Sequence, residues 1–190
     1  MAEIDKKILC TSIELLNEKG VNKFSVRALA RVMNLSMSTL YRNVKGKSDI
    51  YSMICEYVCE NIGEREFYFY PDAKSYLLDI LSSLRRELLQ IRHSAAIFLE
   101  TVPSRPKHME LKPKIMKALA SMGVSESQQF TLTCTLINYV LSNVNDEEFY
   151  RDVSFAIEPG GIIGFYKNQV KNMDYDKQFL DGLELLLKNK

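Results

Sequence analysis

The sequence predicts an all-α fold, and three observations support this prediction. Apolar residues recur at helical spacing along most of the 190 residues, and no stretch alternates at period two for long. The eight glycines and five prolines are too few for a fibrous or low-complexity chain. A hydrophobic fraction of 46% with a charged fraction of 26% is typical of a globular protein with a buried core.

Three helices are predicted near the N-terminus. The first runs from about Ile4 to Lys19 and stops at Gly20. Ser25 can cap the second helix, because its hydroxyl can accept a free backbone N–H of the first turn. The second helix carries apolar residues at positions i, i+3, i+4 and i+7, namely Val26, Leu29, Ala30 and Met33.

A tight turn at Asn34 and Leu35 leads to a third helix, which Ser36 can cap and which extends to Val44. Leu40 and Val44 lie on one face of this helix and should pack inward. The remaining side chains then point outward or sideways: Met37, Ser38, Thr39, Tyr41, Arg42 and Asn43.

Two short helices joined by a tight turn, the second of them polar and basic, follow the helix-turn-helix plan. Residues 1–47 hold nine basic and four acidic residues, a net charge of +5, whereas residues 48–190 carry −4. A basic front joined to an acidic body favours a polyanionic partner such as DNA. Five cations could contact phosphate: Arg27, Arg31, Arg42, Lys45 and Lys47. The alternative is a solvated surface on a three-helix bundle.

The rest of the chain is also predicted to be helical. A long helix from Lys47 to about Glu64 precedes the aromatic run Phe67–Tyr70, which either gates a pocket or fills a junction. Further helices are predicted over about 72–91, 94–100, 127–145 and 175–188, with one more that Pro113 breaks or starts and that stops at Gly123. Ser125–Gln128 forms a capping box, 145–152 is acidic and polar, and 158–161 marks a loop.

Two of these helices carry apolar seams that suit packing against other helices. One seam consists of Phe130, Cys134, Ile137, Leu141 and Val144, and the seam of the last helix consists of Phe179, Leu183 and Leu186. We expect both helices to pair with their copies in a second chain. The result would be a homodimer joined through a four-helix bundle.

Residues 21–30 (VNKFSVRALA) and 38–47 (STLYRNVKGK) resemble the DNA-binding signature of the tetracycline-repressor (TetR) family. The Leu40-Tyr41 pair, followed by a basic residue and a closing Lys47, is the most specific part. Residues 84–89, 98–103 and 123–148 are more loosely similar to the regulatory domain of the tetracycline repressor. The resemblance implies dimeric, all-helical repressors that release DNA when a small molecule enters the C-terminal domain.

The resemblance also implies particular DNA contacts. Base or groove contacts would come from Arg27, Met37, Ser38, Thr39 and Asn43, and phosphate contacts from Tyr41, Arg42 and Lys47. The chemistry of these side chains agrees, because Arg reaches guanine or phosphate, hydroxyls reach either, and Met37 can meet a thymine methyl. The alternative for Tyr41 is partial packing under the helix.

The chain departs from the family at the positions implied to bind the effector. A member that binds a magnesium–tetracycline chelate has His where this chain has Phe98, and two further polar contacts fall on the apolar Ile80 and Leu84. The two histidines, His93 and His108, lack partners at ligand spacing and are expected at the surface. We therefore expect no metal and no cofactor. The expected effector pocket is largely apolar and is lined by Ile80, Leu84 and Phe98. Thr101 and Asn138 are expected to supply its polar groups. The alternative for the three apolar residues is plain core.

The sequence argues against an enzyme, because no glycine-rich phosphate loop and no nucleophile–histidine arrangement stands out. Neither a signal peptide nor a membrane span is recognised, so a cytoplasmic location is expected. We predict a DNA-binding domain over 1–47 and a helical regulatory and dimerisation domain over 48–190. The predicted function is a homodimeric regulator, a repressor, that binds a palindromic operator and is released by a small, largely apolar effector. The alternative is a ligand-binding or protein-partner module of the same fold that no longer binds DNA.

Overall fold

The computed structural model describes residues 3–63, 67–152 and 173–188, and all regular structure in these ranges is helical. The elements in chain order are α1 (Glu3–Lys19), α2 (Val26–Val32), α3 (Met37–Tyr41), α4 (Lys47–Ile62), the 3-10 helix η1 (Phe67–Phe69), α5 (Ala73–Leu88), α6 (Ser94–Glu100), α7 (Pro106–Ser121), α8 (Glu126–Asp152) and α10 (Tyr175–Leu186). The predicted all-α fold is confirmed. The loop expected at 158–161 lies outside the described residues.

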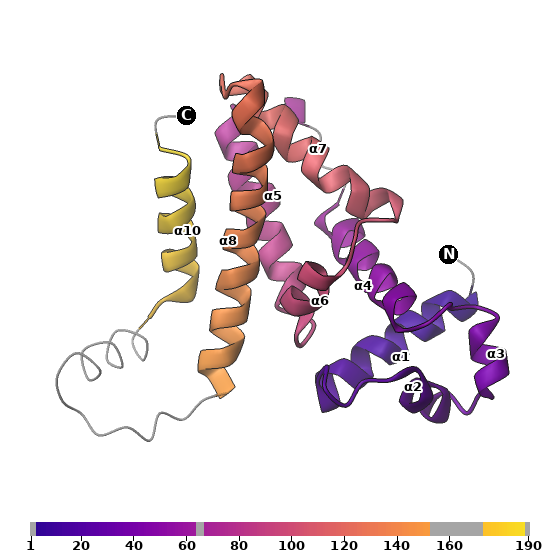
Figure 1. The fold of residues 1–190 in the computed structure, drawn as a ribbon. Coiled ribbons are helices and arrows are strands. Elements are labelled where there is room, and N and C mark those ends of the chain that lie inside the picture. The colour runs from indigo at the N-terminus through magenta and orange to yellow at the C-terminus, as the bar shows by residue number, and fades with distance from the viewer. Residues whose placement is uncertain (1–2, 64–66, 153–172, 189–190) are drawn as a thin grey trace, which may run out of the picture.

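Helices α1, α2 and α3 form a small bundle at one end of the molecule (Figure 1). Both predicted N-caps of this bundle are confirmed: Ser25 accepts the N–H of Ala28, and Ser36 accepts the N–H of Thr39, each at 3.1 Å. Leu40 and Val44 are buried, as predicted. Helix α3 is shorter than expected, because Arg42 caps its C-terminus after five residues.

Helix α4 leaves this bundle and runs into the larger helical body (Figure 1). It packs against α1 at one end and against α5, α6 and α7 along the rest of its length. It ends at Ile62, two residues before the predicted end, because Gly63 turns the backbone to a φ of +84° that favours glycine. The helix is therefore part of both the N-terminal bundle and the body.

The core of the body forms where α4, α5, α7 and α8 meet. Four of the five leucines of α5 have no exposed surface, because they share one face of the helix: Leu77, Leu81, Leu84 and Leu88. Asp72 caps α5 by accepting the N–H of Ser75 at 2.7 Å. The hydrogen bonds from Ser75 also hold the pKa of Asp72 below its usual value.

Helix α7 differs from the prediction at Pro113. The helix begins at Pro106 and continues through Pro113, which neither breaks nor starts it. Pro106 suits the first position because the N–H it lacks would have no helical partner there. Pro113 removes one internal hydrogen bond, but Leu111 and Ile115 on either side of it are buried in the core. Tertiary packing therefore outweighs the local preference.

Helix α8 is longer than predicted. It continues to Asp152, through the acidic and polar stretch 145–152 that the sequence analysis separated from it. The reason lies in Glu147, which is 2% exposed and pairs with Arg85 of α5 inside the protein. Arg85 also donates to Asn143 at 2.7 Å and to Asp176 of α10 at 2.6 Å. Polar residues on this part of α8 thus hold three helices together.

Helices α8 and α10 lie side by side at the edge of the body (Figure 1). The ring of Tyr139 stacks on that of Phe179 at 5.7 Å between centroids, and its hydroxyl donates to the backbone oxygens of Gln178 and Phe179. This close approach requires a glycine at position 182, because a Cβ there would overlap the Tyr139 hydroxyl.

None of the helices in the described ranges combines the length and the hydropathy that a membrane crossing requires.

We predict that Gly182→Ala destabilises the protein by about 1–3 kcal/mol, the usual cost of overpacking a close contact. Urea unfolding followed by circular dichroism would measure the loss. The same substitution in a Tyr139→Ala background should cost clearly less, since the overlapping ring is gone. Equal costs in the two backgrounds would contradict the role assigned to Tyr139.

Candidate DNA-binding surface and its junctions with the body

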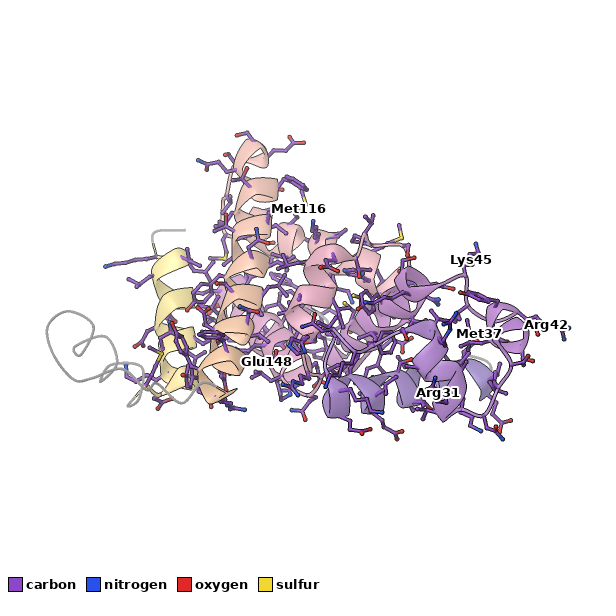
Figure 2. All side chains as sticks on the ribbon, turned by 60° about the horizontal axis from the view of Figure 1, so that its bottom comes forward. Arg31, Met37, Arg42, Lys45, Met116 and Glu148 are labelled. Atoms are coloured by element: carbon purple, nitrogen blue, oxygen red, sulfur yellow. The ribbon has the colours of Figure 1, made fainter. Side chains whose placement is uncertain are left out.

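The predicted DNA contacts all have accessible side chains. Met37 and Thr39 are half-buried, and the other six are exposed: Arg27, Ser38, Tyr41, Arg42, Asn43 and Lys47. Figure 2 shows Arg42 and Lys45 projecting outward at the end of the molecule formed by the N-terminal bundle. Tyr41 is 51% exposed, so the structure does not favour packing of its ring under α3.

The start of α3 is built around Ser36. Its hydroxyl lies 2.9 Å from the Ser38 hydroxyl and 2.8 Å from the Thr39 hydroxyl, in addition to accepting the Thr39 N–H. At the other end of the helix, the Asn43 amide donates to the Thr39 backbone oxygen at 3.0 Å. Asn34, which has a φ of +53°, sets the turn before α3. These contacts fix polar side chains on the outer side of a short, well-anchored helix.

The cations around α3 have no carboxylate partner within the described ranges. Arg27, Arg31, Arg42 and Lys45 form no ion pair there, although acidic residues in the body are paired repeatedly. Lys47 instead lies over the rings of Tyr51 and Phe24, 5.2 and 6.0 Å from their centroids. An exposed group of uncompensated cations attracts a polyanion and retains its charge for that partner.

Helix α4 is joined to the start of α7 by three polar contacts that the sequence analysis did not predict. Arg105 donates to the Asp49 carboxylate at 2.8 Å, and Ser104 donates to the Ser52 hydroxyl at 3.3 Å. One turn further along α4, the buried carboxylate of Glu56 accepts the backbone N–H groups that follow Pro106.

The Glu56 carboxylate caps α7 from outside that helix. It accepts the N–H of Lys107 at 3.0 Å and that of His108 at 2.9 Å, whereas the N-cap residue of α7 supplies no side-chain bond of its own. The positive end of the α7 dipole favours this carboxylate. The spacing of 49, 52 and 56 on one face of a helix was visible in the sequence, but their partners about fifty residues away were not.

A second junction links the end of α1 to the turn between α5 and α6. The Asn17 amide donates to the Gln90 backbone oxygen at 3.2 Å, and its oxygen accepts the N–H of Arg92 at 2.8 Å. The Nδ1 atom of His93 accepts the N–H of Val21 at 3.4 Å. His93 has a left-handed φ of 62°, and its own N–H donates to Glu148 of α8. This second junction therefore joins the N-terminal bundle to the body independently of α4.

The expectation that both histidines lie at the surface is wrong. His108 is 4% exposed, and its ring lies 4.5 Å from the ring of Phe98. His93 is half-buried in the second junction. Burial lowers the pKa of His108, against an opposing effect of the nearby Glu56 carboxylate. His108 is therefore a buried residue that packs beside the Glu56 cap of α7.

The residues predicted to bind an effector separate into three groups. Ile80, Leu84 and Phe98 are buried among the core residues, which favours the plain-core alternative for them. Asn138 is exposed on α8, so its predicted place inside an apolar pocket is wrong. Thr101 lines a cleft between the start of α4 and the segment after α6.

Four of the predicted dimer contacts are corrected by the structure. Ile137, Leu141, Phe179 and Leu183 are between 0% and 5% exposed in the single chain, so they have no surface left for a partner. The seams of α8 and α10 pack against each other and against the rest of the body. Phe130, Cys134 and Leu186 keep accessible surface. Helical periodicity located the apolar seams correctly, but it did not predict which helices cover them.

Within the described residues, no group of three His, Cys, Asp or Glu side chains is placed to hold a metal ion. Cys55 and Cys59 lie one turn apart in α4 and are buried. Burial raises the pKa of the Cys55 thiol to about 12 and that of Cys59 higher still, which keeps both protonated. Both are part of the buried core that α4 forms with its neighbours.

Known proteins resemble this chain along most of its length. Residues 74–154 match a family model described as "Tetracyclin repressor-like, C-terminal domain". A helix-turn-helix-type transcriptional regulator of Saccharopolyspora erythraea is 25% identical over 145 residues, 76% of this chain and 61% of that protein. The class D tetracycline repressor protein of Escherichia coli is 24% identical over 199 residues, which cover 99% of this chain and 89% of the repressor.

The fold agrees with solved structures of TetR family proteins. The structure of ActR from Streptomyces coelicolor without ligand has a TM-score of 0.77, with 21% identity and coverage of 98% of this chain and 94% of that one. ActR has also been solved in complex with actinorhodin. The fold and these relatives are those of helix-turn-helix transcriptional regulators, the class of protein that this chain resembles. Within that class, the chain is similar to proteins of the TetR family, whose C-terminal domain model matches residues 74–154.

We predict that the pKa of His108 contributes to the pH dependence of stability. Because the pKa is lower in the folded protein than its usual value near 6.5, only the unfolded chain takes up this proton as the pH falls below 6.5. The free energy of unfolding should therefore fall with decreasing pH from about 6.5. Urea unfolding of the parent and of His108→Phe between pH 7.5 and pH 5 would measure both slopes.

The variant should show the shallower slope below pH 6.5, and the two slopes should agree above pH 7. Parallel curves throughout the range would remove His108 from the pH dependence.

Proposed function

We propose that the chain is a homodimeric repressor that binds a near-palindromic operator and is released by a small molecule. The observation that carries this proposal is the group of exposed cations around α3 without carboxylate partners in the described ranges. In this proposal residues 1–47 form the DNA-binding domain, and residues 48–190 form the regulatory and dimerisation domain. The protein acts in the cytoplasm.

In the proposed complex, α3 enters a major groove about 12 Å wide. Met37, Ser38 and Thr39 at its start face the base edges, with Arg27 from α2 and Asn43 beside them. Tyr41, Arg42 and Lys47 contact phosphate. Two-fold symmetry would place two such helices roughly 34–36 Å apart, so that the operator has two matching half-sites.

Selection from a pool of random 30-base-pair duplexes tests the proposal as a whole, at roughly physiological 0.15 M salt. Enrichment of a palindrome would support it and would give the half-site spacing. Failure to enrich any sequence with an intact dimer would favour a module that no longer binds DNA.

We predict that Arg42→Ala weakens binding to all duplexes by a similar factor, since a phosphate contact carries no sequence information. The slope of the logarithm of affinity against the logarithm of salt concentration should become shallower by about one. Fluorescence anisotropy between 50 and 200 mM salt would measure it. Arg86→Ala is the matched control, because Arg86 is an exposed arginine on α5 in the body.

An Arg42→Ala variant with the parental affinity and salt slope would remove Arg42 from the DNA-binding surface. An equal effect of Arg86→Ala would show that net charge alone is responsible.

The surface proposed for dimerisation follows from the corrected burial of α8 and α10. Leu180 and Leu185 of α10 are 44% and 70% exposed, and Phe130 of α8 is 58% exposed. Together with Cys134 and Leu186, these residues give the two helices apolar side chains that remain accessible in the single chain. Exposed apolar residues on two neighbouring helices are suited to pack against their copies in a four-helix bundle.

We predict that Leu180→Glu with Leu185→Glu converts the dimer into a folded monomer, because four charged groups would face each other across the two-fold axis. Sedimentation velocity would measure the mass and circular dichroism the helix content. Leu99→Glu is the matched control, since Leu99 is 62% exposed but lies on α6. A dimeric double variant would contradict the proposed interface. Leu141→Glu and Leu183→Glu are unsuitable, because both leucines are buried inside one chain.

Release would be transmitted through α4. The helix carries the N-terminal bundle and is bonded to the start of α7 through Asp49, Ser52 and Glu56. A ligand that moves the start of α7 therefore pulls on α4 and changes the separation of the two α3 helices. Such a ligand must bind the released state more tightly, and a 100-fold loss of DNA affinity requires about 2.7 kcal/mol of coupling.

A further inference from the structure

A cleft lies where the start of α4 faces the segment that follows α6. Its volume is about 510 Å³. Small-molecule sites usually measure roughly 300–1,000 Å³, so an organic molecule of modest size fits it. The residues that line the cleft include the predicted phosphate contact Lys47 and the hydrogen-bonded pair Ser52 and Ser104.

The cleft has charged groups of both signs and apolar surface in the same space. Lys47 supplies an ammonium group and Glu100 a carboxylate. The ring of Tyr51 and the side chain of Val102 supply apolar surface. Hydroxyl groups make up the rest of the lining: Ser48, Ser52, Thr101 and Ser104. Lys47 and Glu100 form no ion pair with each other or with another described residue, so each keeps its charge for a ligand.

The hydroxyl of Tyr51 is an independent indication that the cleft binds a ligand. It is 5% exposed, and its hydroxyl has no hydrogen-bond partner among the described residues. A buried hydroxyl without a partner is costly, and few occur in folded proteins. The cation–ring contacts of Lys47 with Tyr51 and Phe24 also hold the ammonium beside the cleft.

We propose that this cleft binds a small amphipathic organic acid that also carries a hydrogen-bond donor. The acid group pairs with Lys47 and accepts a hydrogen bond from the Tyr51 hydroxyl, the donor bonds to Glu100, and the apolar part lies against Val102. This effector is more polar than the one expected from Ile80, Leu84 and Phe98, which lie in the core. The proposal of binding stands alone, and only its effect on DNA rests on the proposed function.

The consequence for DNA binding follows from the position of Lys47. An ammonium paired with a ligand carboxylate is no longer available to a phosphate of the operator. The ligand also sits beside Ser52 and Ser104, which join α4 to the chain before α7. Occupation of the cleft would therefore weaken DNA binding by direct competition and by displacing the start of α4.

The probe for the test is 4-hydroxybenzoate, which has an acid group, a flat apolar ring and a donor at the far end. Titration of the full chain, followed by calorimetry and by amide shifts in two-dimensional NMR, would measure both affinity and location. The expected Kd is on the order of 1 mM, as for an efficient ligand with few non-hydrogen atoms. The largest shifts should fall on residues 47–52 and 100–104.

Two analogues and three variants test the assigned contacts. 4-Hydroxybenzamide, which lacks the charge, and the variant Lys47→Met should each weaken binding about tenfold. Glu100→Gln should weaken 4-hydroxybenzoate several-fold and leave benzoate, which lacks the donor, unchanged or tighter. Ser104→Phe should abolish binding by filling the cleft. Lys45→Met is the matched control, because Lys45 is an exposed lysine outside the lining.

Absence of saturable binding of both acids at roughly 20 mM, far above the expected Kd, would overturn the proposed site. Equal affinity in the parent, Lys47→Met and Ser104→Phe proteins, or shifts confined to other regions, would also overturn it. Localised binding by a chain that never binds DNA would instead overturn the proposed function and leave the site intact. Localised binding that leaves the affinity for a selected operator unchanged would contradict only the effect on release.

Discussion

The carboxylate of Glu56 is the contact on which the arrangement of α4 and the body depends. It is 7% exposed, and it satisfies two backbone N–H groups at the start of α7 that have no partner within their own helix. A carboxylate buried at that depth without those donors would be strongly destabilising. Helix α4 and the start of α7 must therefore lie in one relative position. The N-terminal bundle, which α4 carries, takes its direction from this contact.

Local signals in the sequence predicted the parts of the fold that local physics determines. The caps Ser25 and Ser36 each accept the backbone N–H of the residue three positions later, so both partners lie within one short stretch of sequence. The buried leucines of α5 follow from spacing alone. The exposed side of α3 was predictable for the same reason, because burial of Leu40 and Val44 leaves the other side chains outside.

The parts that could not be predicted depend on partners far apart in the chain. Spacing identified the apolar seam of α8 but not what covers it. In the structure, other helices of the same chain, α10 among them, cover most of this seam. The polar stretch at the end of α8 is helical because Glu147 meets Arg85 sixty-two positions earlier. His108 is buried because Glu56 and Phe98 surround it. No short motif in the sequence predicts any of these contacts.

Helix α10 differs from the other helices in how it is attached. Its contacts come from α8 and α5, chiefly through the Tyr139 stack and the buried Arg85. A unit held along one side can open by itself at a lower free energy than the whole molecule unfolds. In the proposed dimer the same helix is covered on its outer side, so opening requires the two copies to separate first. Local opening of α10 and association are then linked, and amide exchange in this helix becomes slower as the concentration of protein rises.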